Sequence, residues 1–73
     1  MNIERDVPHY TSGGLEVIEI LRAKMSAEQF RGFLLGNTLK YLFRYQHKGN
    51  PKDDLLKART YLTWLIEEIS RED

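Results

Sequence analysis

The tripeptide Gly49-Asn50-Pro51 constrains the fold most, because it ends one long helical pattern and begins another. Gly49 can take the left-handed geometry that closes a helix, Asn50 can cap the next helix, and Pro51 suits a first helical position. Asp53 and Asp54 then favour the positive end of that helix's dipole. The tripeptide therefore predicts two long antiparallel helices joined by a short loop.

A capping box marks the start of the first long helix. In Ser26-Ala27-Glu28-Gln29, the serine oxygen can accept one free backbone N–H while the glutamine side chain accepts another. We expect this helix to span residues 27–47, with Tyr41 and Tyr45 at the border of its apolar stripe. The stripe itself comprises Phe30, Phe33, Leu34, Thr38 and Leu42.

Gly32 and Gly36 lie four residues apart within the same helix, where each glycine costs about 1 kcal/mol relative to alanine. Such a pair indicates that another helix or a ligand approaches the backbone closely. Of the two, another helix is the favoured interpretation.

The second long helix is expected to span residues 51–69. Trp64 falls on a face beside its apolar stripe, together with Lys57 and Tyr61, and is interpreted as an interface residue. The expected core stripe comprises Leu55, Ala58, Leu62, Leu65, Ile66 and Ile69.

The N-terminal region is expected to add a short third helix. Pro8 disfavours helical geometry at the preceding residue, so residues 1–8 are predicted to form an extended arm. A turn follows at residues 11–14, and the apolar spacing then predicts a helix over residues 15–24. Residues 9–73 would form a single helical domain.

The size of the chain predicts self-association. A domain of 73 residues buries only about 60% of its unfolded surface and usually needs an additional constraint. The chain has no cysteine and only two histidines, which excludes disulfides and disfavours a structural zinc site. We therefore expect a compact all-α domain of three helices that forms a homo-oligomer, either a dimer or a tetramer, with no metal and no cofactor.

The charge balance limits the partners. Eleven basic and eleven acidic residues cancel, so the uniform positive field of a DNA or RNA coat is missing. No apolar run approaches the roughly 20 residues of a membrane span. Neither a nucleic acid nor a membrane is expected as a partner, and any anion site must be local.

Four residues of the first long helix share one side of it, because Asn37, Lys40, Tyr41 and Arg44 are spaced i, i+3, i+4 and i+7. Lysine and arginine bind phosphate, a tyrosine ring can stack on a base, and an amide can bind a base edge or a sugar hydroxyl. A nucleotide could use such a surface. The alternative is a half-buried tyrosine flanked by solvated cations.

Catalytic motifs are not found. The sequence holds no Walker-type phosphate loop, no cysteine nucleophile and no His-Glu-x-x-His motif. His9 and Ser12 are close in sequence, but nothing supplies the third member of a triad. No catalytic residue is assigned, and binding is favoured over catalysis.

Five blocks of the sequence occur in the order and spacing of a known family: His9–Tyr10, Gly14–Glu19, Met25–Phe33, Leu35–Tyr41 with Arg44, and Asp54–Ala58 with Tyr61–Leu62. On these blocks, over residues 9–66, the chain resembles the SaV-like family of small bacteriophage proteins. The same module resembles the C-terminal part of a podovirus nucleotide kinase that phosphorylates deoxynucleoside monophosphates. Members of the family are also similar to phage sponge proteins that sequester cyclic nucleotide signals of bacterial immunity.

The resemblance implies nucleotide chemistry in the host cytoplasm. The chain lacks the kinase's N-terminal region and has Tyr45-Gln46-His47-Lys48 where that enzyme has a more basic stretch. Phosphoryl transfer needs two nucleotides held in line with a metal, whereas a sponge needs only affinity. We therefore expect a protein that sequesters a cyclic di- or oligonucleotide without hydrolysing it.

Six residues are predicted to contact this ligand. Lys40 and Arg44 are assigned to phosphates, Tyr10 and Tyr41 to stacking on bases, and His9 and Asn37 to polar contacts with a base or sugar. A symmetric oligomer suits such a ligand, because an isologous interface presents the same groups to both halves.

Two alternatives remain. The first is a deoxynucleoside monophosphate kinase, in which Lys40 and Arg44 stabilise the transferred phosphoryl group and Asp54 holds magnesium. The second is a module that binds a host protein through Trp64, Tyr61 and Tyr45.

Overall fold

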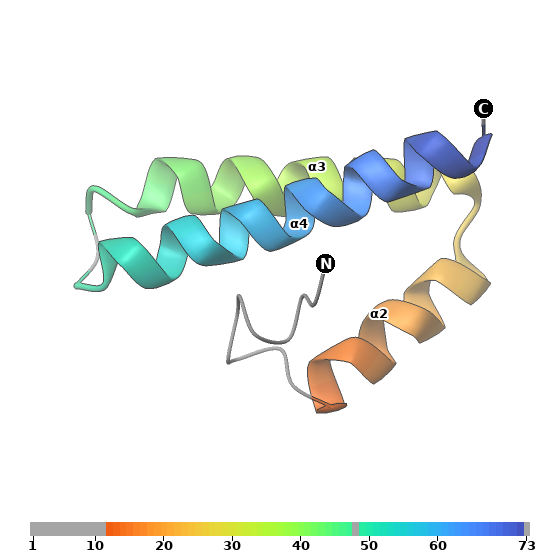
Figure 1. Cartoon of the computed structure of the whole chain (residues 1–73), viewed down its shortest axis with the longest axis horizontal. Coiled ribbons are helices and arrows are strands. Elements are labelled where there is room, and N and C mark those ends of the chain that lie inside the picture. The colour runs from red at the N-terminus through yellow and green to blue at the C-terminus, as the bar shows by residue number, and fades with distance from the viewer. Residues whose placement is uncertain (1–11, 48, 73) are drawn as a thin grey trace.

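The computed structural model describes residues 12–47 and 49–72, which form three α-helices and no strand. They are α2 (Ser12–Lys24), α3 (Ala27–Arg44) and α4 (Pro51–Glu72). The two long helices α3 and α4 lie side by side and antiparallel, and α2 lies at an angle to them beyond a short linker (Figure 1). For the described residues, the predicted all-α fold of three helices is confirmed.

Both predicted helix starts are confirmed by their caps. The Gln29 N–H donates to Ser26 Oγ at 3.1 Å, and the Ser26 N–H donates to Gln29 Oε1 at 2.9 Å, which is the complete capping box of α3. The Asp53 N–H donates to Asn50 Oδ1 at 3.3 Å, and Pro51 is the first residue of α4. Local side-chain chemistry thus fixes where both long helices begin.

The helix ends differ from the sequence expectations. Helix α3 ends at Arg44 rather than near residue 47, because the chain passes into a turn in which the His47 N–H donates to the Arg44 carbonyl at 2.9 Å. Gly49 has no positive φ, so the prediction of a left-handed C-cap there is wrong. Helix α4 continues to Glu72 instead of ending near residue 69. Helix α2 begins at Ser12, within the segment expected to be a turn.

Aromatic rings form the centre of the core between α3 and α4. The Tyr61 ring stacks on Tyr41, with centroids 5.9 Å apart and planes 12° apart, and meets Trp64 edge-on at 5.5 Å. Phe33 also meets Tyr61 edge-on, at 6.1 Å. Offset-stacked and edge-on rings are the favoured arrangements, because they align the negative face of one ring with the positive edge of another. The buried hydrophobic residues are Ile18, Phe30, Leu34, Tyr41, Ala58, Tyr61 and Trp64.

The core stripe expected on α4 is largely wrong. Of its six members only Ala58 is buried and Leu65 partly buried, whereas Trp64, expected at an interface, lies in the core. The physical reason is that aromatic side chains bury more apolar area per residue than aliphatic ones, and the helix orients to bury Tyr61 and Trp64. The remaining four members are exposed: Leu55, Leu62, Ile66 and Ile69.

The expected stripe on α3 is mostly confirmed, with two changes. Phe30, Leu34 and Thr38 are buried, but Leu42 is exposed and Tyr41 is buried rather than at the border. Thr38 is accommodated in the core because its hydroxyl donates to the Leu34 carbonyl at 2.8 Å.

The two α3 glycines are not approached within the chain. A Cβ atom added at Gly32 or at Gly36 would have no atom within 4 Å, so neither glycine meets another described helix. The close approach of another helix, predicted for this glycine pair, is therefore not made within the described part of the chain.

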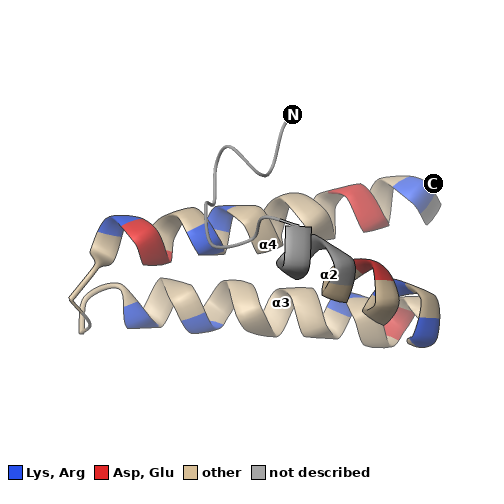
Figure 2. Ribbon diagram, turned by 90° about the horizontal axis from the view of Figure 1, so that it is seen from below, with Lys and Arg blue, Asp and Glu red and all other residues tan. Residues whose placement is uncertain are grey.

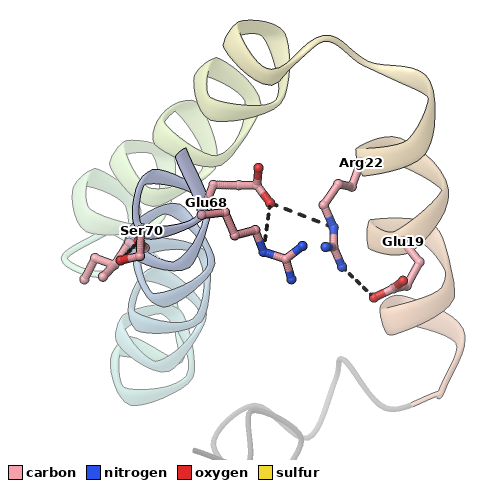
Figure 3. Close-up of polar contacts among 6 residues, drawn as sticks. Glu19, Arg22, Glu68 and Ser70 are labelled. Atoms are coloured by element: carbon pink, nitrogen blue, oxygen red, sulfur yellow. Dashed lines mark hydrogen bonds and ion pairs between the residues drawn. The ribbon is translucent and has the colours of Figure 1, made fainter. Parts of the chain in front are cut away.

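Helix α2 is held by a few contacts. Ile18 is buried against the core, and Leu21 and Met25 pack partly against it. Arg22 pairs with Glu19 at 2.9 Å and reaches Glu68 of α4 at 3.9 Å, as Figure 3 shows. Glu68 also forms an ion pair with Arg71, with 3.8 Å between Glu68 Oε1 and Arg71 Nε. The Arg22–Glu19 pair is exposed on the Glu19 side and contributes little, so α2 is held mainly by the partly buried Arg22–Glu68 pair and by Ile18, Leu21 and Met25.

None of the described helices combines the length and apolarity that crossing a membrane requires.

Candidate functional site

Three cations surround the ring of Tyr41. Lys40 Nζ lies 4.5 Å from the ring centroid, Lys57 Nζ 5.4 Å and Arg44 Cζ 5.5 Å. Figure 2 shows basic residues of α3 and α4 towards the loop that joins these helices, whereas the middle of α3 carries no charge. We call this group the Tyr41 cluster, and its members are Lys40, Tyr41, Arg44, Asp54 and Lys57.

Tyr41 is a fixed platform within this cluster. It exposes only 7% of its surface, and its ring stacks on Tyr61. A cation over an aromatic face is attracted by the ring quadrupole, which orients the side chain at a small cost in entropy. The contacts therefore indicate that Tyr41 positions cations, and the little ring surface that remains exposed is a poor place for a base. Its role in stacking on a base stays a prediction.

Asp54 is the least expected member of the cluster. It is 2% exposed, and its Oδ2 lies 3.4 Å from Arg44 Nε with no hydrogen-bond partner among the described residues. A buried carboxylate is costly unless a charge compensates it, so Arg44 has a structural role besides any role in binding. The sequence placed Asp54 at the positive end of the helix dipole and, in the kinase alternative, on magnesium, and neither prediction included this pair.

The signal that could have revealed the pair is the spacing of Asp54, Ala58 and Tyr61. These residues are spaced i, i+4 and i+7, which places the carboxylate on the same stripe as the two core residues. An acidic residue on a core stripe requires a cation nearby.

The charges of the cluster are not balanced. Besides the Arg44–Asp54 pair, Lys57 Nζ lies 4.0 Å from Asp53 Oδ2. Lys40 has no ion pair with any residue in the described part of the chain. Three cations thus face two carboxylates, and the excess positive charge lies at Lys40.

Asn37 lies one turn before the cluster on α3. Its Nδ2 donates to the Phe33 carbonyl at 2.9 Å, and the side chain is partly buried. One of its donors is therefore used within the helix. Of the six predicted site residues, the structure brings together Lys40, Tyr41 and Arg44.

His9 and Tyr10 lie outside the described residues, as does the predicted arm over residues 1–8. Sequence reasoning did not name Lys57 as a site residue. Its contact with Tyr41 joins two helices, so no spacing within one helix could reveal it.

Among residues 12–47 and 49–72, no three His, Cys, Asp or Glu side chains are grouped so that they could hold a metal ion. The polar chemistry of this region is that of a small cationic surface with one buried carboxylate.

Comparison with known proteins gives a family without an assigned activity. No curated protein matches the chain, and no solved structure does. A family model described as a protein of unknown function, DUF3310, matches residues 5–63. Because this match covers most of the 73 residues, the chain belongs to the DUF3310 family.

Proposed function

We propose that this chain binds a cyclic di- or oligonucleotide at the Tyr41 cluster and sequesters it without converting it. In this proposal the protein acts in the cytoplasm of a phage-infected host and removes a cyclic nucleotide signal of bacterial immunity. The resemblance to small phage proteins supports the context, and the contacts of the cluster support the chemistry.

The observation that carries the proposal is the gathering of Lys40, Arg44 and Lys57 around one ring. Arg44 and Lys57 each pair with a carboxylate, so the positive charge that an anion can neutralise lies at Lys40. Phosphate is suited to this position, because it accepts several charge-assisted hydrogen bonds from lysine and arginine. Lys40 is the primary phosphate ligand in this account, since no described carboxylate neutralises it.

Sequestration is favoured over the kinase alternative by the state of Asp54. In that alternative Asp54 holds magnesium, but the carboxylate is 2% exposed and paired with Arg44. A metal would have to break this pair and open the core to reach it. A coupled assay with ATP, magnesium and each deoxynucleoside monophosphate tests this choice, and no turnover is expected.

The interaction-module alternative is weakened by the positions of its anchors. Trp64 and Tyr61 are buried between α3 and α4, so a protein partner could reach them only by opening the core. Tyr45 is partly exposed and is the one anchor still accessible.

We also propose that the chain functions as a homo-oligomer, as expected for a domain of this size.

The test is calorimetric titration with a purine cyclic dinucleotide. Lys40→Ala should weaken binding by at least about tenfold, because a hydrogen bond to a charged group contributes about 1.5 to 3 kcal/mol. Lys52→Ala is the matched control, since Lys52 is an exposed lysine of α4 outside the cluster and should bind as the wild type does. Equal loss in both variants, or no binding of any cyclic nucleotide to the wild type, would refute the proposal.

Heat denaturation of the complex supplies the second half of the test. Chromatography of the released ligand should recover the cyclic dinucleotide unchanged. A linear or cleaved product would show conversion and would contradict sequestration.

A further inference from the structure

The α3–α4 hairpin exposes an apolar surface that a protein of this size rarely leaves in water. Eight large apolar side chains on these two helices each expose between 40% and 74% of their surface. We call this set the apolar face, and its members are Leu35, Leu39, Leu42, Phe43, Leu55, Leu62, Ile66 and Ile69.

The two halves of the apolar face lie on the same side of the hairpin. On α3, exposed Leu35 directly follows buried Leu34, and on α4, exposed Leu62 directly follows buried Tyr61. One residue step turns a helix by about 100°, so each exposed stripe is rotated in the same sense from its helix's buried stripe. Because α3 and α4 are antiparallel, the same rotation, viewed from each helix's own start, points to one side of the pair. The exposed leucines and isoleucines therefore form one continuous surface, and Phe43, which is about 180° around α3 from buried Leu34, lies at its outer edge.

The composition of this surface is that of an interface. From Gly32 to Leu39, α3 has no charged residue, and the open positions of Gly32 and Gly36 allow another backbone to approach closely. The exposed area of the eight side chains is roughly 700 Å², beyond the 300–600 Å² of a typical largest patch on a monomer and close to the ~800 Å² per partner of a stable interface.

We propose that a second copy of this chain covers the apolar face, forming a two-fold symmetric dimer in which two hairpins pack as a four-helix bundle. An isologous contact needs one self-complementary patch, and a mainly apolar surface is complementary to itself, with Arg59 as the charged residue beside its α4 half. The area matches what such a dimer must bury, and the dimer supplies the constraint that a domain of this size otherwise lacks.

The dimer leaves the Tyr41 cluster outside the interface. Lys40 precedes Tyr41 whereas Leu42 follows it, so the two residues turn away from the buried stripe in opposite directions. Each copy then carries its own cluster on the side opposite its partner. The inference stands on exposure and helix geometry alone and does not depend on nucleotide binding.

The first test is sedimentation equilibrium at micromolar concentration. The wild type should show twice the chain mass of 8.6 kDa. Leu39→Glu and Ile66→Glu should each sediment as monomers, because a carboxylate would be buried against apolar side chains. Val17→Glu is the matched control, since Val17 is an exposed apolar residue of α2 outside the face, and this variant should remain dimeric. A folded wild type at 8.6 kDa would overturn the proposal.

A second measurement does not depend on the folding of a charged variant. The chain has no cysteine, so Leu62→Cys and Val17→Cys each introduce one thiol. The thiol at residue 62 should react slowly with a maleimide in concentrated protein and faster on dilution, whereas the thiol at residue 17 should react fast throughout. Equal, concentration-independent rates at both positions would place the interface elsewhere and overturn the proposal.

Discussion

The two sides of the α3–α4 hairpin differ in how far contacts within the chain cover their side chains. On the side of the Tyr41 cluster, rings and charges contact one another within the chain, and even the buried carboxylate of Asp54 faces a guanidinium. On the apolar face, eight large apolar side chains each expose between 40% and 74% of their surface. One side is thus packed mainly by contacts within the chain, whereas the other is the side that we propose a second copy covers.

The largest effect is expected in the aromatic core. Tyr61→Ala removes the ring that contacts Tyr41, Phe33 and Trp64 and should lower the free energy of unfolding by about 3 to 5 kcal/mol. Urea denaturation monitored by circular dichroism measures this. The matched change on the apolar face is Phe43→Ala, made in the monomeric Ile66→Glu background, and it should cost no more than about 0.5 kcal/mol. Equal losses would remove the distinction between the two sides.

A smaller effect is expected at the buried ion pair. Arg44→Ala leaves Asp54 buried without its cation and should cost about 1 to 3 kcal/mol, even though Arg44 itself is partly exposed. The same change in an Asp54→Asn background should cost less, with a coupling of about 0.5 to 3 kcal/mol. Thermal and urea unfolding of the four proteins give the coupling. Additive losses would show that the pair contributes nothing.

This pair also decides which variant tests ligand binding. A loss of affinity in Arg44→Ala could come either from a lost ligand contact or from a destabilised fold, because Arg44 compensates the buried carboxylate of Asp54. Lys40 has no such role among the described residues, so Lys40→Ala should change the free energy of unfolding by at most about 0.5 kcal/mol.

The smallest effect is expected at the α3 glycines, and it has the opposite sign. Gly36→Ala in the monomeric Ile66→Glu background should raise the free energy of unfolding by about 0.5 to 1 kcal/mol, because alanine favours the helix and the added Cβ meets nothing. Gly32→Ala provides the parallel measurement. A destabilised monomer would show that these positions are occupied within the chain.

The sequence predicted the features that depend on local chemistry. Ser26 and Asn50 cap the two long helices as expected, because a cap needs only side-chain and backbone groups within one turn. Lys40, Tyr41 and Arg44 also lie together as predicted, since their spacing alone places them on one side of α3.

Contacts between helices were not predicted. Lys57 and Asp54 join the site from α4, and their places depend on how that helix is rotated against α3. The same rotation explains the error on α4, where Leu62 and Ile66 form a true apolar stripe that faces away from the chain's own core. A periodic apolar stripe indicates burial without stating which molecule buries it.

Titration of a purine cyclic dinucleotide into Ile66→Glu and Lys40→Ala tests whether the two sides of the hairpin act independently. Monomeric Ile66→Glu should bind the dinucleotide within about twofold of the wild-type affinity, since changes at separated sites add without coupling. Lys40→Ala, still a dimer, should bind it at least about tenfold more weakly. Loss of binding in Ile66→Glu with full affinity in Lys40→Ala would instead place the ligand site at the apolar face and refute this independence.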